Sequence, residues 1–96
     1  MIYADLHKTD DEGHLILTCF GTRKDLADNN VVLEDNLKLV FYMDDGDLDG
    51  NKDDLIFEGV VNFDPKNNRW VATIDWDGVK NLSKLTLEEK TKLGLN

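Results

Sequence analysis

Apolar and polar residues alternate along three consecutive stretches of the chain, residues 37–43, 55–63 and 69–76. Because successive side chains of a β-strand point to opposite faces, such alternation places the apolar residues of each stretch on one face of a sheet. These apolar sets are Leu37, Leu39, Phe41 and Met43; then Phe57, Val61 and Phe63; and finally Trp70, Ala72, Ile74 and Trp76. The pattern predicts a three-stranded meander whose apolar face lines the core.

Two earlier stretches, residues 2–8 and 14–20, show the same period of two. The polar residues 9–13 between them predict a turn, because Gly13 can adopt a positive φ without steric cost. We therefore predict that these two strands form a hairpin. The second stretch is apolar on both faces, which favours a central position or a place where the sheet curls over itself.

The connections between the strands carry turn and helix signals. Residues 64–68 predict a hairpin loop, because proline presets the first corner of a turn and asparagine tolerates left-handed backbone. Residues 22–28 predict a single helical turn with Thr22 as its N-cap, and their one large apolar residue, Leu26, limits the turn to a short connection. Another helical turn is expected near residues 78–84.

The end of the chain has helix punctuation but little amphipathic character. Thr86 and Glu89 match a capping box, and Gly94 stands where a helix would stop. Leu87 and Leu93 are six residues apart, however, which does not place them on one helix face. We therefore predict that residues 86–96 form a weakly ordered or short helical tail after a single β domain at residues 1–85.

Together these elements predict a mainly β fold, either a small antiparallel five-stranded curled sheet or an SH3-like barrel, with a short C-terminal helical segment. A flat sheet would leave apolar residues wet on its second face, namely Ile16, Phe20, Val40 and Tyr42. We favour the barrel, because curling buries those side chains. A sheet covered by the C-terminal helical segment is the alternative, and loop lengths do not decide between the two.

Composition narrows the class of function. The chain has 96 residues, of which 41% are hydrophobic and 32% charged, which is typical of one globular domain. Its net charge of −9 opposes binding to nucleic acid and to anionic membranes, and it favours basic proteins or cations as partners. The single cysteine, the absence of a signal-peptide pattern and the absence of a spanning apolar run predict a soluble cytoplasmic protein.

The loop between the first two strands of the meander holds the strongest candidate chemistry. Residues 44–54 contain six aspartates and one lysine, which gives this loop a net charge of −5. Its central part resembles the opening of an EF-hand calcium loop, where oxygen ligands on alternate residues converge before a glycine bend. The resemblance implies these calcium ligands: Asp45, Asp47, Asp49, Asn51 and Asp53.

The resemblance is short and departs from the motif at several places. Ile56 stands where the motif has its bidentate glutamate, Lys52 replaces an apolar residue, and a strand rather than a helix precedes the loop. Because the glutamate is the strongest ligand, any calcium site here is expected to be weak. The simpler interpretation is a solvated hairpin loop, whose aspartates favour turns and solubility.

Other chemistry-bearing residues give weaker signals. In the predicted first hairpin His7 and His14 flank the turn and can face each other, and with a nearby carboxylate they can bind zinc. Cys19 shares a face with Leu15 and Leu17, which indicates a small buried hydrophobe rather than a nucleophile. The two tryptophans belong to the core or to the rim of a groove.

The sequence thus predicts a small acidic, non-enzymatic protein-interaction domain that contacts a protein with a basic surface. The alternative is a weak calcium-binding module that uses the loop at residues 45–53. An enzyme is the third hypothesis, and no paired nucleophile and base supports it.

Overall fold

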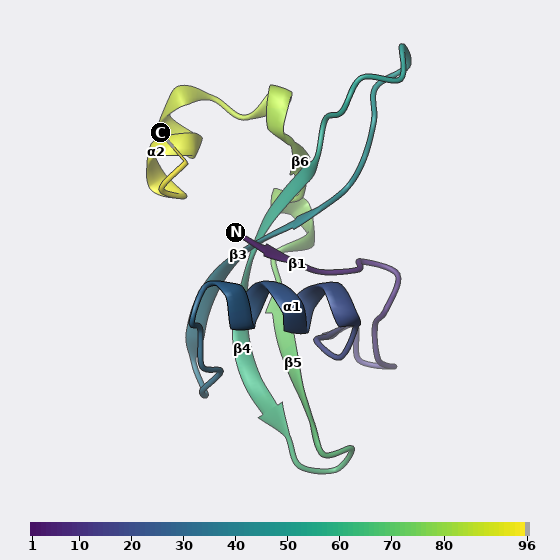
Figure 1. Ribbon diagram of the computed structural model, residues 1–96, viewed down its shortest axis with the longest axis vertical. Coiled ribbons are helices and arrows are strands. Elements are labelled where there is room, and N and C mark those ends of the chain that lie inside the picture. The colour runs from purple at the N-terminus through teal and green to yellow at the C-terminus, as the bar shows by residue number, and fades with distance from the viewer. Residues whose placement is uncertain (96) are drawn as a thin grey trace.

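The computed structural model describes residues 1–95, and the chain there forms one mixed sheet with short helices around it (Figure 1). The strands are β1 (Ile2–Tyr3), β2 (Leu15–Ile16), β3 (Leu37–Met43), β4 (Leu55–Asp64), β5 (Arg69–Ile74) and β6 (Lys80–Asn81). The helices are α1 (Phe20–Asp28) and α2 (Leu87–Lys92), with two 3-10 turns, η1 (Trp76–Gly78) and η2 (Leu82–Lys84). The sheet has the order β1-β3-β4-β5-β2, and β6 adds to β4.

The antiparallel meander β3-β4-β5 is confirmed. Leu39 pairs with Gly59 and Val61 pairs with Ala72, so the apolar sets of the three strands lie on one face. The turn after β4 also follows the sequence, because Asn68 has a φ of 52°. β5 ends at Ile74, however, two residues earlier than the alternation predicts.

The core lies on this face of the meander. It contains these buried residues: Ile2, Ala4, Leu15, Leu17, Leu26, Phe41, Phe57, Val61, Ala72 and Ile74. Leu37, Leu39, Met43 and Trp70 are partly buried and pack against it. The prediction that Phe63 and Trp76 belong to the core was wrong. Phe63 is 37% exposed beside the β4–β5 turn. Trp76 is 45% exposed, because the chain leaves the sheet and enters η1 there.

The first two strands are much shorter than predicted, and they do not form the expected hairpin. β1 runs parallel to β3, and β2 runs antiparallel to β5, so the two lie at opposite ends of the sheet. Next to the turn the two segments remain joined by an isolated antiparallel bridge from Thr9 to Leu15, with backbone bonds from the Asp10 N–H to the His14 carbonyl and from the Ile16 N–H to the Lys8 carbonyl. The prediction of an all-antiparallel sheet is therefore corrected to a mixed one. With β1 and β2 as its two ends, the sheet curls into a half-barrel rather than a closed barrel (Figure 1).

Helix α1 explains the parallel strand, because it holds β1 against β3. The carboxylate Oδ2 of Asp25 accepts the backbone N–H of Tyr3 at 2.9 Å and the hydroxyl of Tyr42 at 3.1 Å. The Thr22 hydroxyl donates to the Tyr3 carbonyl at 2.6 Å. Thr22 is fully buried between α1 and β1. The prediction that Thr22 is the N-cap of this helix was wrong, because the helix begins earlier and its N-cap is Cys19.

The second face of the sheet carries a smaller apolar contact, where Ile56 and Leu85 line the same cavity. Both are buried outside the main core cluster, and so is Val71 in β5, which does not line that cavity. Leu85 and Leu93 line a cavity of about 160 Å³ together with Ile56, so the C-terminal segment covers the start of β4 there. The predicted capping box is confirmed at the start of α2, with Thr86 and Glu89 bonding each other's backbone N–H. No helix within residues 1–95 is long and apolar enough to cross a membrane.

Candidate interaction site: the acidic arm and the C-terminal strap

Residues 44–54 form a hairpin extension, here named the acidic arm, that projects from β3 and β4 beyond the rest of the sheet (Figure 1). Gly46 and Lys52 form a β-bridge, and the Asp53 N–H donates to the Asp45 carbonyl at 3.0 Å. The tip is closed by a bond from the Asp47 N–H to the Asn51 carbonyl at 2.9 Å. The arm is therefore a hydrogen-bonded hairpin, so its carboxylates are displayed on an ordered scaffold.

Local chemistry accounts for the tip. Oδ1 of Asp47 accepts the backbone N–H groups of Asp49 and Asn51, each at 2.9 Å, as aspartates do in tight turns. Gly50 has a φ of 81°, a left-handed conformation that glycine adopts without steric cost. Leu48 stands between two aspartates and is fully solvent-exposed, at 106% of its reference area. The tip thus presents one apolar side chain flanked by carboxylates.

The five residues proposed as calcium ligands lie in this arm, but several of them already have protein partners. Asp47 holds the tip as described, Asp45 accepts the Asn81 amide at 2.9 Å, and Asp53 accepts two bonds from Ser83. Within residues 1–95, no three His, Cys, Asp or Glu side chains are grouped to hold a metal ion. The calcium hypothesis stays a prediction, and its ligands would have to exchange these contacts for a cation.

The residues that sequence reasoning missed lie in the segment that follows the meander. Residues 80–85, here named the C-terminal strap, run along the base of the acidic arm. The Asn81 amide nitrogen donates to the Asp53 carbonyl at 2.7 Å and to Oδ2 of Asp45 at 2.9 Å. The Leu82 N–H donates to the Asp54 carbonyl at 2.8 Å. The strap therefore contacts the arm through both its backbone and its side chains.

Ser83 makes the tightest contact between strap and arm. Its hydroxyl donates to Oδ2 of Asp53 at 2.6 Å, and its backbone N–H donates to Oδ1 at 3.0 Å. The hydroxyl bond and then the backbone bond from Ser83 lower the pKa of Asp53 below its usual value. The carboxylate that anchors the strap therefore stays ionised to a lower pH than an ordinary aspartate does. No sequence signal marks this contact, because the two residues are 30 positions apart.

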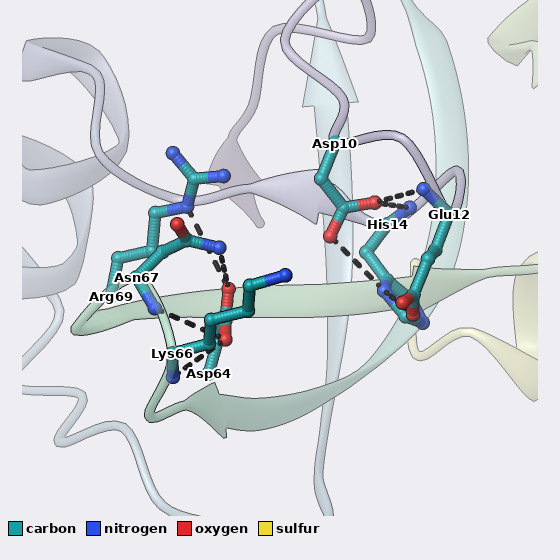
Figure 2. Close-up of polar contacts among 7 residues, drawn as sticks. All are labelled: Asp10, Glu12, His14, Asp64, Lys66, Asn67 and Arg69. Carbon is teal, nitrogen blue, oxygen red and sulfur yellow. Dashed lines mark hydrogen bonds and ion pairs between the residues drawn. The ribbon is translucent and has the colours of Figure 1, made fainter.

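A second cluster of charged residues lies at the other end of the sheet, where a groove of about 590 Å³ separates the 9–14 turn from the β4–β5 turn. Figure 2 shows that each turn is closed by its own aspartate. Asp10 accepts the backbone N–H groups of Glu12 at 2.9 Å and of His14 at 2.8 Å. Burial raises the pKa of Asp10, but these bonds and the His14 ring outweigh it, so the pKa lies below its usual value.

Asp64 has the same role in the β4–β5 turn. It accepts the Asn67 side-chain amide at 2.9 Å and the Lys66 backbone N–H at 3.1 Å (Figure 2). The Asn67 amide is the main reason that the pKa of Asp64 is lowered. Nε of Arg69 lies 4.0 Å from Oδ2 of Asp64, and within residues 1–95 this nitrogen has no hydrogen-bond partner. Both aspartates therefore have a structural explanation as turn residues.

The two histidines that could have bound zinc do not face each other, and Cys19 is not fully buried. Nδ1 of His7 lies 3.1 Å from Asp5, whereas Nδ1 of His14 lies 3.2 Å from Asp10, so each imidazole has a separate carboxylate partner. Cys19 is half-buried at the start of α1, with its sulfur 2.9 Å from the Thr22 hydroxyl. It therefore differs from the fully buried hydrophobe that the sequence predicts.

Comparison with known proteins adds no relative: no protein-family model, curated protein or solved structure matches the chain. The fold and the site define the class of protein only as far as a small, mainly β domain with a projecting acidic arm.

Proposed function

We propose that this chain is a small non-enzymatic protein-interaction domain of the cytoplasm, which presents its acidic arm to a partner with a basic surface. The observation that carries the proposal is the hairpin itself: an ordered extension with a net charge of −5 whose tip displays Leu48. A disordered acidic loop would lose more conformational entropy on binding than a hydrogen-bonded hairpin does.

The chemistry of the arm indicates the kind of surface that it fits. Asp44 and Asp49 are exposed, and no side-chain hydrogen bond within residues 1–95 occupies either of them. These two carboxylates can pair with Lys or Arg of a partner, which steers association and fixes its register. Leu48, next to Asp49 at the tip, can enter an apolar depression beside those basic residues. The proposed partner is therefore a basic protein surface with a small apolar centre, and nucleic acid and anionic membranes remain disfavoured by charge.

The proposal is tested with a fluorescent peptide of ten lysines at low and at physiological ionic strength. The arm variant Asp44→Asn with Asp49→Asn is compared with the control Asp11→Asn with Glu34→Gln. Each pair removes two exposed carboxylates, and both chains keep the same net charge. Exposed ion pairs contribute about 0.2–1 kcal/mol each, so the arm variant should bind about two- to thirtyfold more weakly than the wild type.

The control isolates the arm from net charge. If the two variants lose the same affinity, binding depends on total charge and the arm is not an interaction site. If the arm variant alone loses affinity, the arm variant and the charge control can then be used to test candidate partner proteins. A true partner should bind the arm variant more weakly than the charge control. Replacing Leu48 by serine should weaken the binding of a true partner and leave the affinity for the lysine peptide unchanged.

The second candidate function is weak calcium binding by the arm. It is favoured by the tight bend at the tip, where Gly50 is left-handed and the Asp47 N–H bonds to the Asn51 carbonyl. Thermal unfolding in calcium is compared with ionic-strength-matched sodium, and both are repeated on Asp47→Asn with Asp49→Asn. A specific site stabilises the folded state by about 1.4 kcal/mol when calcium is tenfold above its dissociation constant. Equal shifts in both salts would remove this candidate.

A further inference from the structure

The C-terminal strap occupies carboxylates that belong to the acidic arm. Ser83 takes both oxygens of Asp53, and Asn81 takes one oxygen of Asp45. The two aspartates lie opposite each other at the base of the arm, one on each side of the hairpin. The Asp53 N–H donates to the Asp45 carbonyl there. The strap thus binds the arm as an internal ligand that supplies an amide, a hydroxyl and a backbone N–H.

The strap is also held at its two ends by contacts outside the arm. At its start β6 pairs with β4, Lys80 opposite Ile56 and Asn81 opposite Leu55. At its end Leu85 is 8% exposed and belongs to the apolar contact on the second face of the sheet. The middle, by contrast, is exposed: Leu82, Ser83 and Lys84 all face solvent. The middle of the strap can therefore leave the arm while both ends remain in place.

We propose that the strap is an autoinhibitory contact: it occupies both oxygens of Asp53 and one oxygen of the exposed Asp45. A basic partner must displace Ser83 and the side chain of Asn81 to use these oxygens. This inference rests on the proposed function of the arm. Binding and strap release are then thermodynamically linked, so loosening the strap tightens binding by the same factor that binding loosens the strap. Asp44 and Asp49 give a first point of attachment that does not require displacement.

The test loosens the strap without altering the charge of the arm. The variant Asn81→Ala with Ser83→Ala is compared with the wild type and with the control Thr18→Ala with Thr73→Ala, which removes two exposed hydroxyls away from the arm. The probe is the fluorescent peptide of ten lysines. The strap variant should bind at least about fivefold more tightly than either reference, the lower end of typical coupling between sites. Unchanged or weaker binding would overturn the proposal.

Hydrogen exchange on the wild-type protein gives a second measurement that needs no variant. Saturating lysine peptide should speed amide exchange at Leu82 and Ser83, whose N–H groups donate to Asp54 and Asp53, and should leave the core strand β4 protected. Slower or unchanged exchange there contradicts the displacement. Failure of the proposed function looks different: the Asp44→Asn, Asp49→Asn variant would then match its charge control. If the Asp44→Asn, Asp49→Asn variant binds more weakly than its charge control but the Asn81→Ala, Ser83→Ala variant binds like the wild type, only the proposal of an autoinhibitory contact is wrong.

Discussion

Gly59 offers a stringent check on how the meander packs, because a single added carbon there meets three neighbours. A Cβ at this position would lie 2.6 Å from Cδ1 of Ile74, 3.0 Å from Cε2 of Phe41 and 3.3 Å from the Cβ of Ala72. The first distance is well inside van der Waals contact, and all three neighbours are buried core residues. Gly59 therefore lies where β3, β4 and β5 leave no room for a side chain.

The expected cost of Gly59→Ala follows from two opposing effects. Overpacking a filled core typically costs about 1–3 kcal/mol. Alanine in a strand recovers about 0.5–1 kcal/mol, since it restricts the unfolded chain more than glycine does. We therefore expect a net loss of about 0–2.5 kcal/mol in the free energy of unfolding, measured by urea denaturation with an unchanged m-value.

The decisive comparison is the double variant with Ile74→Val, which removes the Cδ1 atom that would clash. Ile74→Val alone should cost about 0.5–1.5 kcal/mol. In that background Gly59→Ala should cost less than it does in the wild type, by about 0.5 kcal/mol or more, because residues in contact couple. Strictly additive losses, in which Gly59→Ala costs as much in the Ile74→Val background as beside the native isoleucine, would refute the packing described for these strands.

Three further outcomes are expected. Replacing Thr22 by valine keeps its shape but leaves the Tyr3 carbonyl without its 2.6 Å hydrogen bond, so urea denaturation should show a loss of about 1–3 kcal/mol. The pKa of Asp53, followed by carboxyl NMR, should lie below its usual value and should rise in Ser83→Ala. Because the pKa of Asp53 is lower in the folded state, the Ser83 contact stabilises the fold fully above the ordinary aspartate pKa near about 4. That stabilisation is lost as the pH falls through the folded-state pKa. Deleting residues 88–96 should cost less than about 2 kcal/mol, since α2 contains no buried residue and Leu93 is only partly buried; a larger loss would show that the contact of Leu93 with β4 contributes as much as a fully buried side chain.

The parts of the fold that the sequence predicts are those with long, regular alternation. β3 has the predicted bounds, and β4 differs by one residue, because each strand has one consistently apolar face. The strands at each end of the sheet pair over only two residues, so the alternation in residues 2–8 and 14–20 extends well beyond the hydrogen-bonded part. Alternation describes an extended backbone, whereas strand pairing depends on which neighbour is available.

The parallel pairing of β1 illustrates the limit most clearly. Short turns favour antiparallel neighbours, and residues 9–13 do make a turn, as the positive φ of Gly13 shows. β1 lies instead beside β3, with Tyr3 opposite Tyr42, and the carboxylate of Asp25 binds the Tyr3 N–H across 22 positions of sequence. From the sequence alone, Asp25 is only an acidic residue near the amino end of a predicted helical turn. Its partner is set by tertiary packing, for which a single sequence has no signal.

The candidate site divides along the same line between local and distant contacts. The arm itself is local: its charge, its glycines and its turn-forming aspartates are all visible within eleven consecutive residues. The strap is not, because Asn81 and Ser83 reach back 28 to 36 positions, and neither residue belongs to a motif. Since those contacts consume carboxylates that a local motif would assign to calcium, the same aspartates have two competing uses. Measuring which partner they prefer, the strap, a lysine side chain or a calcium ion, therefore tests the function of the arm directly.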